Sequence, residues 1–326
     1  MKKFIIGSIV CVLFLVSALV VFAAGENIIS MRLGGDQPAE APGEKSHSFF
    51  AERMKEETDG QIIITVYSNA VLGDNLELIE QVQAGVLEMS TASMGWLNSF
   101  VPIVDVFSTP YLFRDKEHYW KVLDGEVGRE IAGYIEGAGM KLLYWIDAGA
   151  RSFYNNVRPI HTPDDLKGLK IRVMGSEVMI KTMKALGASP TTTSFDEVYS
   201  ALQTGIIDGA ENNPPSIDLM KHNEVAKYFS VDEHMMVPDC LLINLDVWNK
   251  LTEEQQDIFI KVSKEAQEFA KEEWAKQEEE ALEIIAKTTE INEIPDKSDF
   301  IEAVKPLQES LSDQFEGYIE KIQAVK

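Results

Sequence analysis

The chain has 326 residues, and its 53 acidic side chains outnumber its 30 basic ones to give a net charge of −23. This balance argues against nucleic acid and anionic membranes as partners, because both would be repelled. With 45% hydrophobic residues the chain is globular, and its length is too great for one ordinary core and favours two lobes.

The first 23 residues are organised as a secretory signal peptide. Two lysines precede an apolar run at 4–22, and Val21-Phe22-Ala23 has the pattern of a cleavage site. An uncleaved anchor is the alternative. Cys11 lacks the approach typical of a lipid-anchored cysteine. We therefore expect a free periplasmic protein with a charge of about −25, whose one cysteine, Cys240, forms no intrachain disulfide.

Strands and helices alternate in the first half of the chain. The predicted elements are strands at 27–33, 61–66, 89–92 and 141–146, and helices at 45–58, from 72 through Val86 and Leu87, at 116–123 and at 126–137. Residues 93–110 are loop-rich and aromatic. This alternation favours a mainly parallel α/β sheet.

The second half continues the alternation and ends in helices. The predicted elements are strands at 150–156, 169–173, 207–211, 232–237 and 240–244, a helical turn at 162–166, helices at 177–186 and 195–204, a long charged helix at 252–279 and terminal helices at 300–322. Two prolines after Asn213 forbid continuation of the strand at 207–211, so we expect a sharp exit loop there.

The strand at 169–173 carries a basic residue, Arg172, close to its end. Alternation places Arg172 on the face opposite Ile171 and Val173. A guanidinium just before a helix start can hold a carboxylate through two parallel hydrogen bonds. A surface strand with solvated basic side chains is the other interpretation of this stretch alone.

Four further polar clusters follow predicted strands, at 34–37, 93–98, 151–156 and 211–213. Ligands of open α/β sheets bind beyond the carboxyl ends of strands. We therefore expect these clusters and Arg172 to converge on one site.

Four motifs, in this order and spacing, resemble those of the solute-binding proteins of tripartite ATP-independent periplasmic (TRAP) transporters. They are LGDNLELIEQVQAGVLEM at 72–89, GARSFYNN at 149–156, DDLKGLKIRVMGS at 164–176 and LGASPTTTSFDEVYSALQTGIIDGAENNPPS at 186–216. The resemblance covers nearly the whole mature chain. It implies a two-lobed α/β periplasmic binding protein with the ligand in the cleft between the lobes. It further implies a long helix that spans both lobes. The implied division is 26–148 plus 238–277 for one lobe and 149–237 plus 278–326 for the other.

The resemblance also implies the ligand contacts of the second lobe. Arg172 matches the arginine that binds the ligand carboxylate, and Arg151 matches a second arginine that commonly adds a contact. Asn212 matches the asparagine of the DGxEN stretch, with Asn213 as the alternative one residue away. Phe195 matches an aromatic residue that often packs on the ligand, and a core position on a helix face is its other interpretation.

Ligand identity is expected to depend on the first lobe. Sialate-binding relatives carry an acidic and a basic residue where Ser93 and Trp96 stand here, which argues against sialate. Trp96 offers a flat apolar face to a sugar ring, or packs in the core. Glu77, Asp36 and Gln37 can accept hydrogen bonds from hydroxyls. Relatives with similar loops often bind sugar acids such as hexuronates, so we expect a sugar acid before a plain dicarboxylate.

The resemblance implies a monomeric protein that delivers an organic acid to TRAP membrane subunits, without a cofactor or metal and without catalysis. A secreted enzyme acting on acidic sugars is the second hypothesis, although the sequence has no GxSxG elbow and no HExxH pair. A sensing module for a receptor would use the same pocket and is the third.

Overall fold

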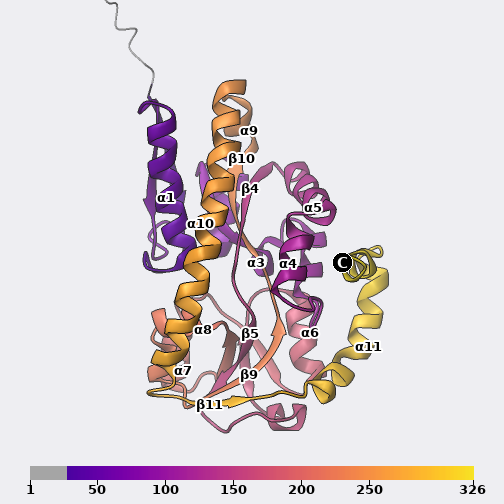
Figure 1. Cartoon of the computed structure of the whole chain (residues 1–326). Helices are drawn as coiled ribbons and strands as arrows, with labels where there is room; N and C mark the ends of the chain where they lie inside the picture. The colour runs from indigo at the N-terminus through magenta and orange to yellow at the C-terminus, as the bar shows by residue number, and fades with distance from the viewer. Residues whose placement is uncertain (1–27) are drawn as a thin grey trace, which may run out of the picture.

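The computed structural model describes residues 28–326, so the signal peptide predicted for residues 1–23 lies outside the described part of the chain. The described chain forms two α/β lobes, each built around its own sheet (Figure 1). Within residues 28–326, no helix is both long enough and apolar enough to cross a bilayer.

The first lobe contains a five-stranded sheet in the order β2-β1-β3-β10-β4. Its strands are β1 (Ile29–Gly34), β2 (Ile62–Tyr67), β3 (Met89–Ser93), β4 (Met140–Ile146) and β10 (Asp239–Asn244). Its helices are α1 (Pro42–Glu57), α2 (Asn75–Gln83), α3 (Met94–Leu97), α4 (Lys116–Leu123), α5 (Glu126–Gly137) and α9 (Leu245–Asn249), with a 3-10 helix, η1, at Pro102–Ser108. The segment at 93–110 that was expected to be loop-rich therefore holds α3 and η1.

The second lobe contains a six-stranded sheet in the order β11-β9-β5-β8-β6-β7. Its strands are β5 (Arg151–Asn155), β6 (Lys170–Val173), β7 (Ser189–Thr192), β8 (Gly209–Asn212), β9 (Tyr228–Met235) and β11 (Glu290–Glu293). The surrounding helices are α6 (Glu177–Ala185), α7 (Val198–Thr204), α8 (Pro214–Leu219) and α11 (Ser298–Gln314), with 3-10 turns η2 (Pro163–Leu166) and η3 (His222–Glu224). The edge strands β7 and β11 were not predicted.

Both sheets are mixed, so the expectation of mainly parallel sheets is correct only for part of each. β1 pairs in parallel with β2 and β3, and β6 pairs in parallel with β7 and β8, but β10 and β5 run antiparallel to both of their neighbours. The chain passes between lobes after β4 and again after β9. β5 and β10 are the first strands after these two crossings. Each begins at the edge of its sheet where the neighbouring strands end, and it therefore runs antiparallel to them.

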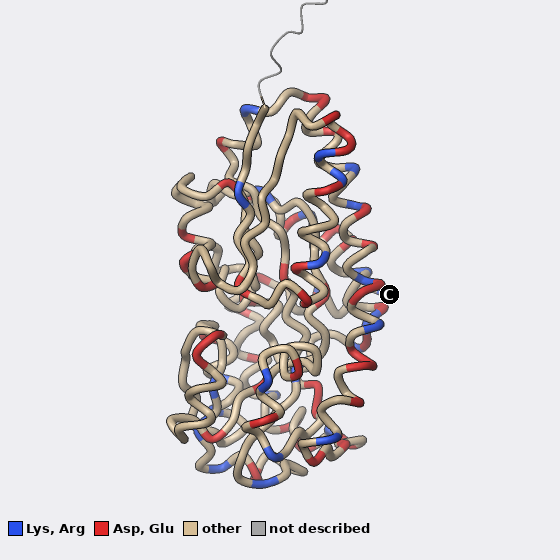
Figure 2. Tube along the Cα trace, turned by 90° about the vertical axis from the view of Figure 1, so that its left-hand side faces the viewer, with Lys and Arg blue, Asp and Glu red and all other residues tan. Residues whose placement is uncertain are grey.

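The helix α10 (Glu253–Ile285) runs unbroken along the molecule and contacts both lobes (Figure 1). It begins with a capping box in which Thr252 accepts a hydrogen bond from the Gln255 amide and Gln255 accepts one from the Thr252 amide. It packs on α1, where Phe49 and Phe269 stack at 4.6 Å, and on α8 in the second lobe. Acidic side chains are spread over both lobes (Figure 2). The long helix thus connects the lobes as expected and extends to Ile285, beyond its predicted end at residue 279.

The end of the chain returns to the first lobe. After α11, α12 (Tyr318–Gln323) packs against α5, where the Tyr318 hydroxyl donates to Glu130 Oε2 at 2.9 Å and Lys321 Nζ lies 2.6 Å from Glu130 Oε1. The division into 26–148 plus 238–277 and 149–237 plus 278–326 stays a prediction. The contact of α12 with α5 places the last residues of the second segment beside the first.

Two predicted helices have different bounds in the structure. The helix that was expected to include Val86 ends at Gln83, because Gly85 adopts the left-handed conformation (φ +70°) that terminates helices. Val86 is 58% exposed as a result. The helix expected from Phe195 begins at Val198, so Phe195 belongs to the loop before α7.

Candidate functional site

A small polar cavity lies between the two lobes. It is lined by Asp36, Gln37, Asn75, Ser93, Trp96, Ala148, Arg151, Arg172, Met174, Phe195, Asn212, Asn213, Ser216 and Asp239. Residues at the carboxyl ends of β1, β3, β6 and β8, or in the loops that follow these ends, line the cavity. The predicted convergence of polar strand ends therefore occurs in the structure.

Arg172 is the cation of this cavity that has no ion-pair partner. Its side chain is 2% exposed, and its Nε and Nη2 donate to the Thr193 carbonyl at 2.9 and 2.6 Å. Within residues 28–326 no carboxylate lies at ion-pairing distance from it. Burial lowers the pKa of Arg172 to about 10, so the guanidinium stays charged at neutral pH. The interpretation as an ordinary surface strand is wrong, because the side chain is buried against a cavity.

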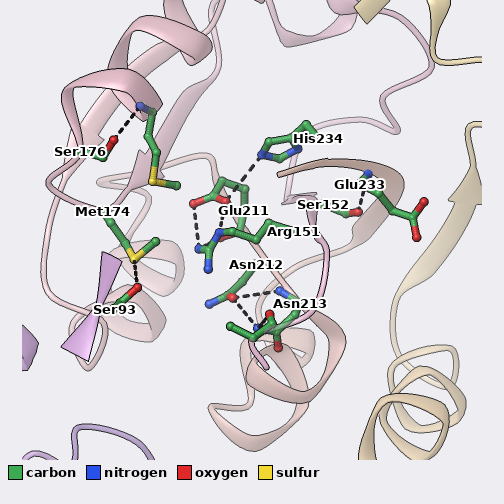
Figure 3. Close-up of polar contacts among 12 residues, drawn as sticks. Ser93, Arg151, Ser152, Met174, Ser176, Glu211, Asn212, Asn213, Glu233 and His234 are labelled. Carbon is green, nitrogen blue, oxygen red and sulfur yellow. Dashed lines mark hydrogen bonds and ion pairs between the residues drawn. The ribbon is translucent and has the colours of Figure 1, made fainter. Parts of the chain in front are cut away.

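Arg151 belongs to a buried chain of alternating charges (Figure 3). Its Nη2 donates to Glu211 Oε1 at 2.9 Å, and its Nε also binds the Glu211 carboxylate. His234 Nε2 lies 3.6 Å from Glu211 Oε2, and His234 Nδ1 lies 2.9 Å from Asp232 Oδ2. All four side chains are buried, so the positive charge of Arg151 is largely compensated within the protein.

The pKa values within this buried chain of alternating charges follow from burial and from the neighbouring charges. Burial alone would lower the pKa of His234, but Asp232 and Glu211 raise it to about 9 and keep the imidazole protonated. Burial would raise the pKa of Glu211, and Arg151 outweighs it so that the pKa falls below its usual range. Arg151 and His234 are therefore cations at neutral pH, and Glu211 between them is an anion.

The two asparagines after β8 have different roles. Asn213 caps α8, accepting from the Ser216 amide at 2.8 Å, and its Nδ2 donates to the Ala148 carbonyl at 2.8 Å. Asn212 Oδ1 accepts from the backbone and side chain of Asn213 at 2.9 and 3.0 Å (Figure 3). Asn212 Nδ2 has no partner among the described residues, so it is the better placed of the two to donate to a ligand. The prolines that follow do not form an irregular loop but occupy the first turn of α8, where a missing N–H costs nothing.

The first lobe supplies acidic and hydroxyl groups to the cavity. Asp36 follows β1, and Asp239 begins β10. Burial raises the pKa of Asp36 to about 6 and that of Asp239 to about 7. Ser93 Oγ lies 3.5 Å from Met174 Sδ of the second lobe. The ligand would therefore meet acceptors on this side and cations on the other.

Trp96 closes one side of the cavity against the second lobe. A Cβ added at Gly175 would lie 2.6 Å from the Trp96 ring, and one added at Gly95 would lie 2.5 Å from Met174 Cε. These two glycines therefore allow the lobes to approach closely. The ring lines the cavity and also packs against the apolar core, and its contact with a sugar ring stays a prediction.

Phe195 likewise serves two purposes. It lines the cavity from the loop before α7, and its ring lies edge-on to His222 at 5.7 Å. It also belongs to the apolar cluster formed with Val198 and Leu202. The core interpretation is therefore confirmed, and packing on the ligand stays a prediction for a residue that lines the cavity.

Glu77 is the predicted contact that lies outside the cavity. It forms a capping box with Asp74: the Glu77 amide donates to Asp74 Oδ1 at 2.9 Å, and the Asp74 amide donates to Glu77 Oε2 at 3.1 Å. The D-x-x-E spacing is the sequence signature of this motif. Its Oε2 is therefore engaged at the start of α2, and the side chain does not line the cavity, so the structure gives no support to a contact between Glu77 and ligand hydroxyls.

Five cavity residues were not predicted: Asn75, Ala148, Met174, Ser216 and Asp239. Asn75 lies two residues before Glu77, and its Oδ1 accepts from the Ser93 amide at 3.0 Å. Asp239 and Met174 line the wall from β10 and from the turn after β6. Met174 follows the KIRV strand directly and could have been found from that proximity. Nothing in the sequence around Asp239 marks it as a site residue.

Several buried groups make stability depend on pH. Burial raises the pKa of Glu44, behind the cavity, to about 8. Asp239, Glu44 and His234 have folded-state pKa values of about 7, 8 and 9, and the unfolded chain releases these protons at lower pH. Their contribution to stability is therefore lost as the pH rises through these values. The buried His47 and His222, whose pKa values fall to about 3, act in the opposite direction only below pH 6.5.

We therefore expect the melting temperature to fall steadily between pH 7 and pH 9. Thermal unfolding followed by circular dichroism measures this. Glu44→Gln, which mimics the protonated acid and keeps the acceptor for the Ser68 hydroxyl, should flatten the decline. A flat profile in the parent protein, or an unchanged slope in the variant, would contradict the assignment.

The chain is similar to known proteins along nearly its whole length. A family profile described as "Bacterial extracellular solute-binding protein, family 7" matches residues 33–314. The C4-dicarboxylate-binding periplasmic protein DctP of Rhodobacter capsulatus is 32% identical over 99% of this chain and 97% of its own.

Two solved structures of TRAP periplasmic solute-binding proteins are also similar. The protein from Roseobacter denitrificans, with bound β-D-glucuronate, has 36% identity and a TM-score of 0.88 over 91% of this chain and 100% of its own. The protein from Xanthobacter autotrophicus Py2, with bound β-D-galacturonate, has 38% identity and a TM-score of 0.87 over the same shares.

Proposed function

Because the chain belongs to bacterial extracellular solute-binding protein family 7, the solute-binding proteins of TRAP transporters, we propose that it captures a sugar acid, with hexuronates in first place, for uptake. The bound acid is delivered to the membrane subunits of a TRAP transporter. The proposal places the protein in the periplasm after removal of its signal peptide, and gives it a binding role without catalysis.

The observation that carries this proposal is the unpaired, buried guanidinium of Arg172 in the cavity between the lobes. A ligand carboxylate there forms charge-assisted hydrogen bonds away from water, worth on the order of 1.5–3 kcal/mol net. Arg151 and Asn212 lie in the same wall and add donors. A larger groove between α5 and α12 contains Glu130 and Glu316 but no cationic lining residue, so it does not suit an organic acid.

The first lobe accounts for the preference for sugars. Asp36, Gln37 and Ser93 offer acceptors for hydroxyl groups, and Trp96 offers an apolar face for the C–H side of a ring. The bound glucuronate and galacturonate of two relatives with 36% and 38% identity support hexuronates before dicarboxylates.

Binding would be coupled to closure of the two lobes. The predicted lobes, 26–148 plus 238–277 and 149–237 plus 278–326, meet at the crossings after β4 and β9 and along α10. A hinge at these places lets a ligand that contacts both walls favour the closed state, by as much as it binds that state more tightly. No observation on the described residues favours the enzyme or receptor-sensing alternatives, so the transport role is the one we carry forward.

Sugar acids are expected to raise the melting temperature, and their neutral parent sugars are not. A thermal-shift panel of uronates, aldonates, dicarboxylates, sialate and neutral hexoses tests this, because a ligand that binds only the folded state stabilises it by mass action. A response to dicarboxylates alone would reject the proposed ligand class.

A further inference from the structure

The two walls of the cavity carry opposite charges. Arg151 and Arg172 come from β5 and β6 of the second lobe, whereas Asp36 and Asp239 come from the first. A ligand held between the lobes therefore faces cations at one end and carboxyl groups at the other.

Asp36 is an acceptor without a partner. Its Oδ1 is buried and makes no hydrogen bond within residues 28–326. Burial raises the pKa of Asp36, while nearby Asn75 and the positive charge of Arg172 act to lower it. A buried acceptor that is left unsatisfied costs free energy, and a hydroxyl of a bound ligand would satisfy it.

Asp239 lies where the cavity meets a second, smaller space. That space is lined by Glu44, His47, Thr91 and Trp274, while Asp239 and Asn213 line both spaces. Ser93, Asp36, Arg151 and Asp147 all act on the Asp239 carboxyl group. The far end of a ligand anchored on Arg172 would reach this acidic boundary.

The balance of charge decides what that end can be. Glu211 compensates Arg151, so Arg172 supplies one uncompensated positive charge, which is enough for one ligand carboxylate. A second carboxylate would be placed against Asp36 and Asp239 without a cation of its own. At pH 8, above the pKa values of about 6 and about 7 to which burial raises these two acids, both are mostly ionised and their charge disfavours binding of a second carboxylate, whereas a hydroxyl donates to either acid.

We propose that Asp36 and Asp239 determine specificity by accepting hydrogen bonds from the hydroxyl end of the ligand and by rejecting acids that carry a carboxylate at both ends. This inference rests on the proposed function, because it takes Arg172 as the anchor of the first carboxylate. It makes the protein selective for monocarboxylate sugar acids over the corresponding sugar diacids.

Matched ligands of one carbon skeleton test the inference by calorimetric titration. D-glucuronate and D-gluconate carry one carboxylate, and D-glucarate carries two; gluconate and glucarate are both open chains, so ring closure does not confound that comparison. D-galacturonate, D-galactonate and galactarate form a second set. We expect the diacid of a set to bind at least about 30-fold more weakly than its tighter monoacid.

Asp239→Asn should weaken monoacid binding about tenfold and reduce the preference over the diacid by at least about tenfold. Asp36→Asn should act in the same direction and serves as the second variant if the first does not fold. Glu77→Gln is the matched control, because it neutralises an acid outside the cavity while keeping a capping-box residue, and both affinities should be unchanged.

Three outcomes would overturn the inference. If the parent protein binds diacids as tightly as monoacids, the acidic wall does not discriminate. If both Asn variants weaken binding of the monoacid and of the diacid equally, Asp36 and Asp239 only maintain the shape of the cavity. If no sugar acid of either set binds, the proposed function fails together with the inference, which is a different result from the first two.

Discussion

Arg172→Ala is expected to weaken binding of a sugar acid at least about 100-fold while the protein stays folded. The ligand carboxylate would lose its main cation in a cavity where Arg151 is already compensated by Glu211. In the parent protein the Arg172 side chain makes two hydrogen bonds, both to the Thr193 carbonyl. Its removal therefore takes little from the fold, and it relieves the cost of a buried charge without an ion-pair partner.

Calorimetric titration with D-glucuronate and D-galacturonate measures this loss, and circular dichroism checks the fold. Arg172→Lys is the matched control, because it keeps the charge and loses the planar fork that binds two carboxylate oxygens. We expect its affinity to lie between those of the parent and of the alanine variant. Near-normal affinity of Arg172→Ala would remove Arg172 as the anchor and with it the basis of the proposed function.

The second-lobe wall of the site was the easier part to predict. Arg172 lies next to the carboxyl end of β6, where the rule on strand ends places a ligand site, whereas Arg151 begins the antiparallel strand β5 and was predicted from the motif that resembles the family. The choice between Asn212 and Asn213 could not be made from sequence, because it depends on which side chain caps α8. Which residue caps the helix depends on the backbone at the helix start, and an asparagine suits either position.

The first-lobe wall was harder because its residues come from distant elements. Asp239 reaches the cavity only because β10 returns from the other lobe and pairs with β3 and β4. The direction of a returning strand depends on which lobe it comes from, and local periodicity does not contain that information. Asn75, for which no role was predicted, lines the cavity in place of Glu77 for a local reason, because Glu77 belongs to the capping box at the start of α2.

Glu211→Ala is expected to lower the free energy of unfolding by about 3–5 kcal/mol, which is the usual cost of breaking a buried ion pair from one side. Glu211 lies between two buried cations, Arg151 and His234, and its removal leaves both without this partner. Asp232 still contacts His234 Nδ1 at 2.9 Å, so the imidazole keeps one anion while Arg151 loses its ion-pair partner. The larger part of the loss should therefore come from Arg151.

Urea denaturation of the variants measures the change in the free energy of unfolding. Glu117→Ala is the matched control, since Glu117 pairs with Lys121 on an exposed helix face and its loss should cost less than about 1 kcal/mol. Because Glu211 helps to raise the pKa of His234 to about 9, that pKa should also fall in Glu211→Ala, as an NMR titration of the histidines would record. A small loss of stability together with an unchanged His234 titration would mean that the alternating chain of charges does not hold Arg151 in place. Arg151 would then be a second free cation in the cavity, and the single uncompensated charge on which rejection of diacids depends would no longer describe the site.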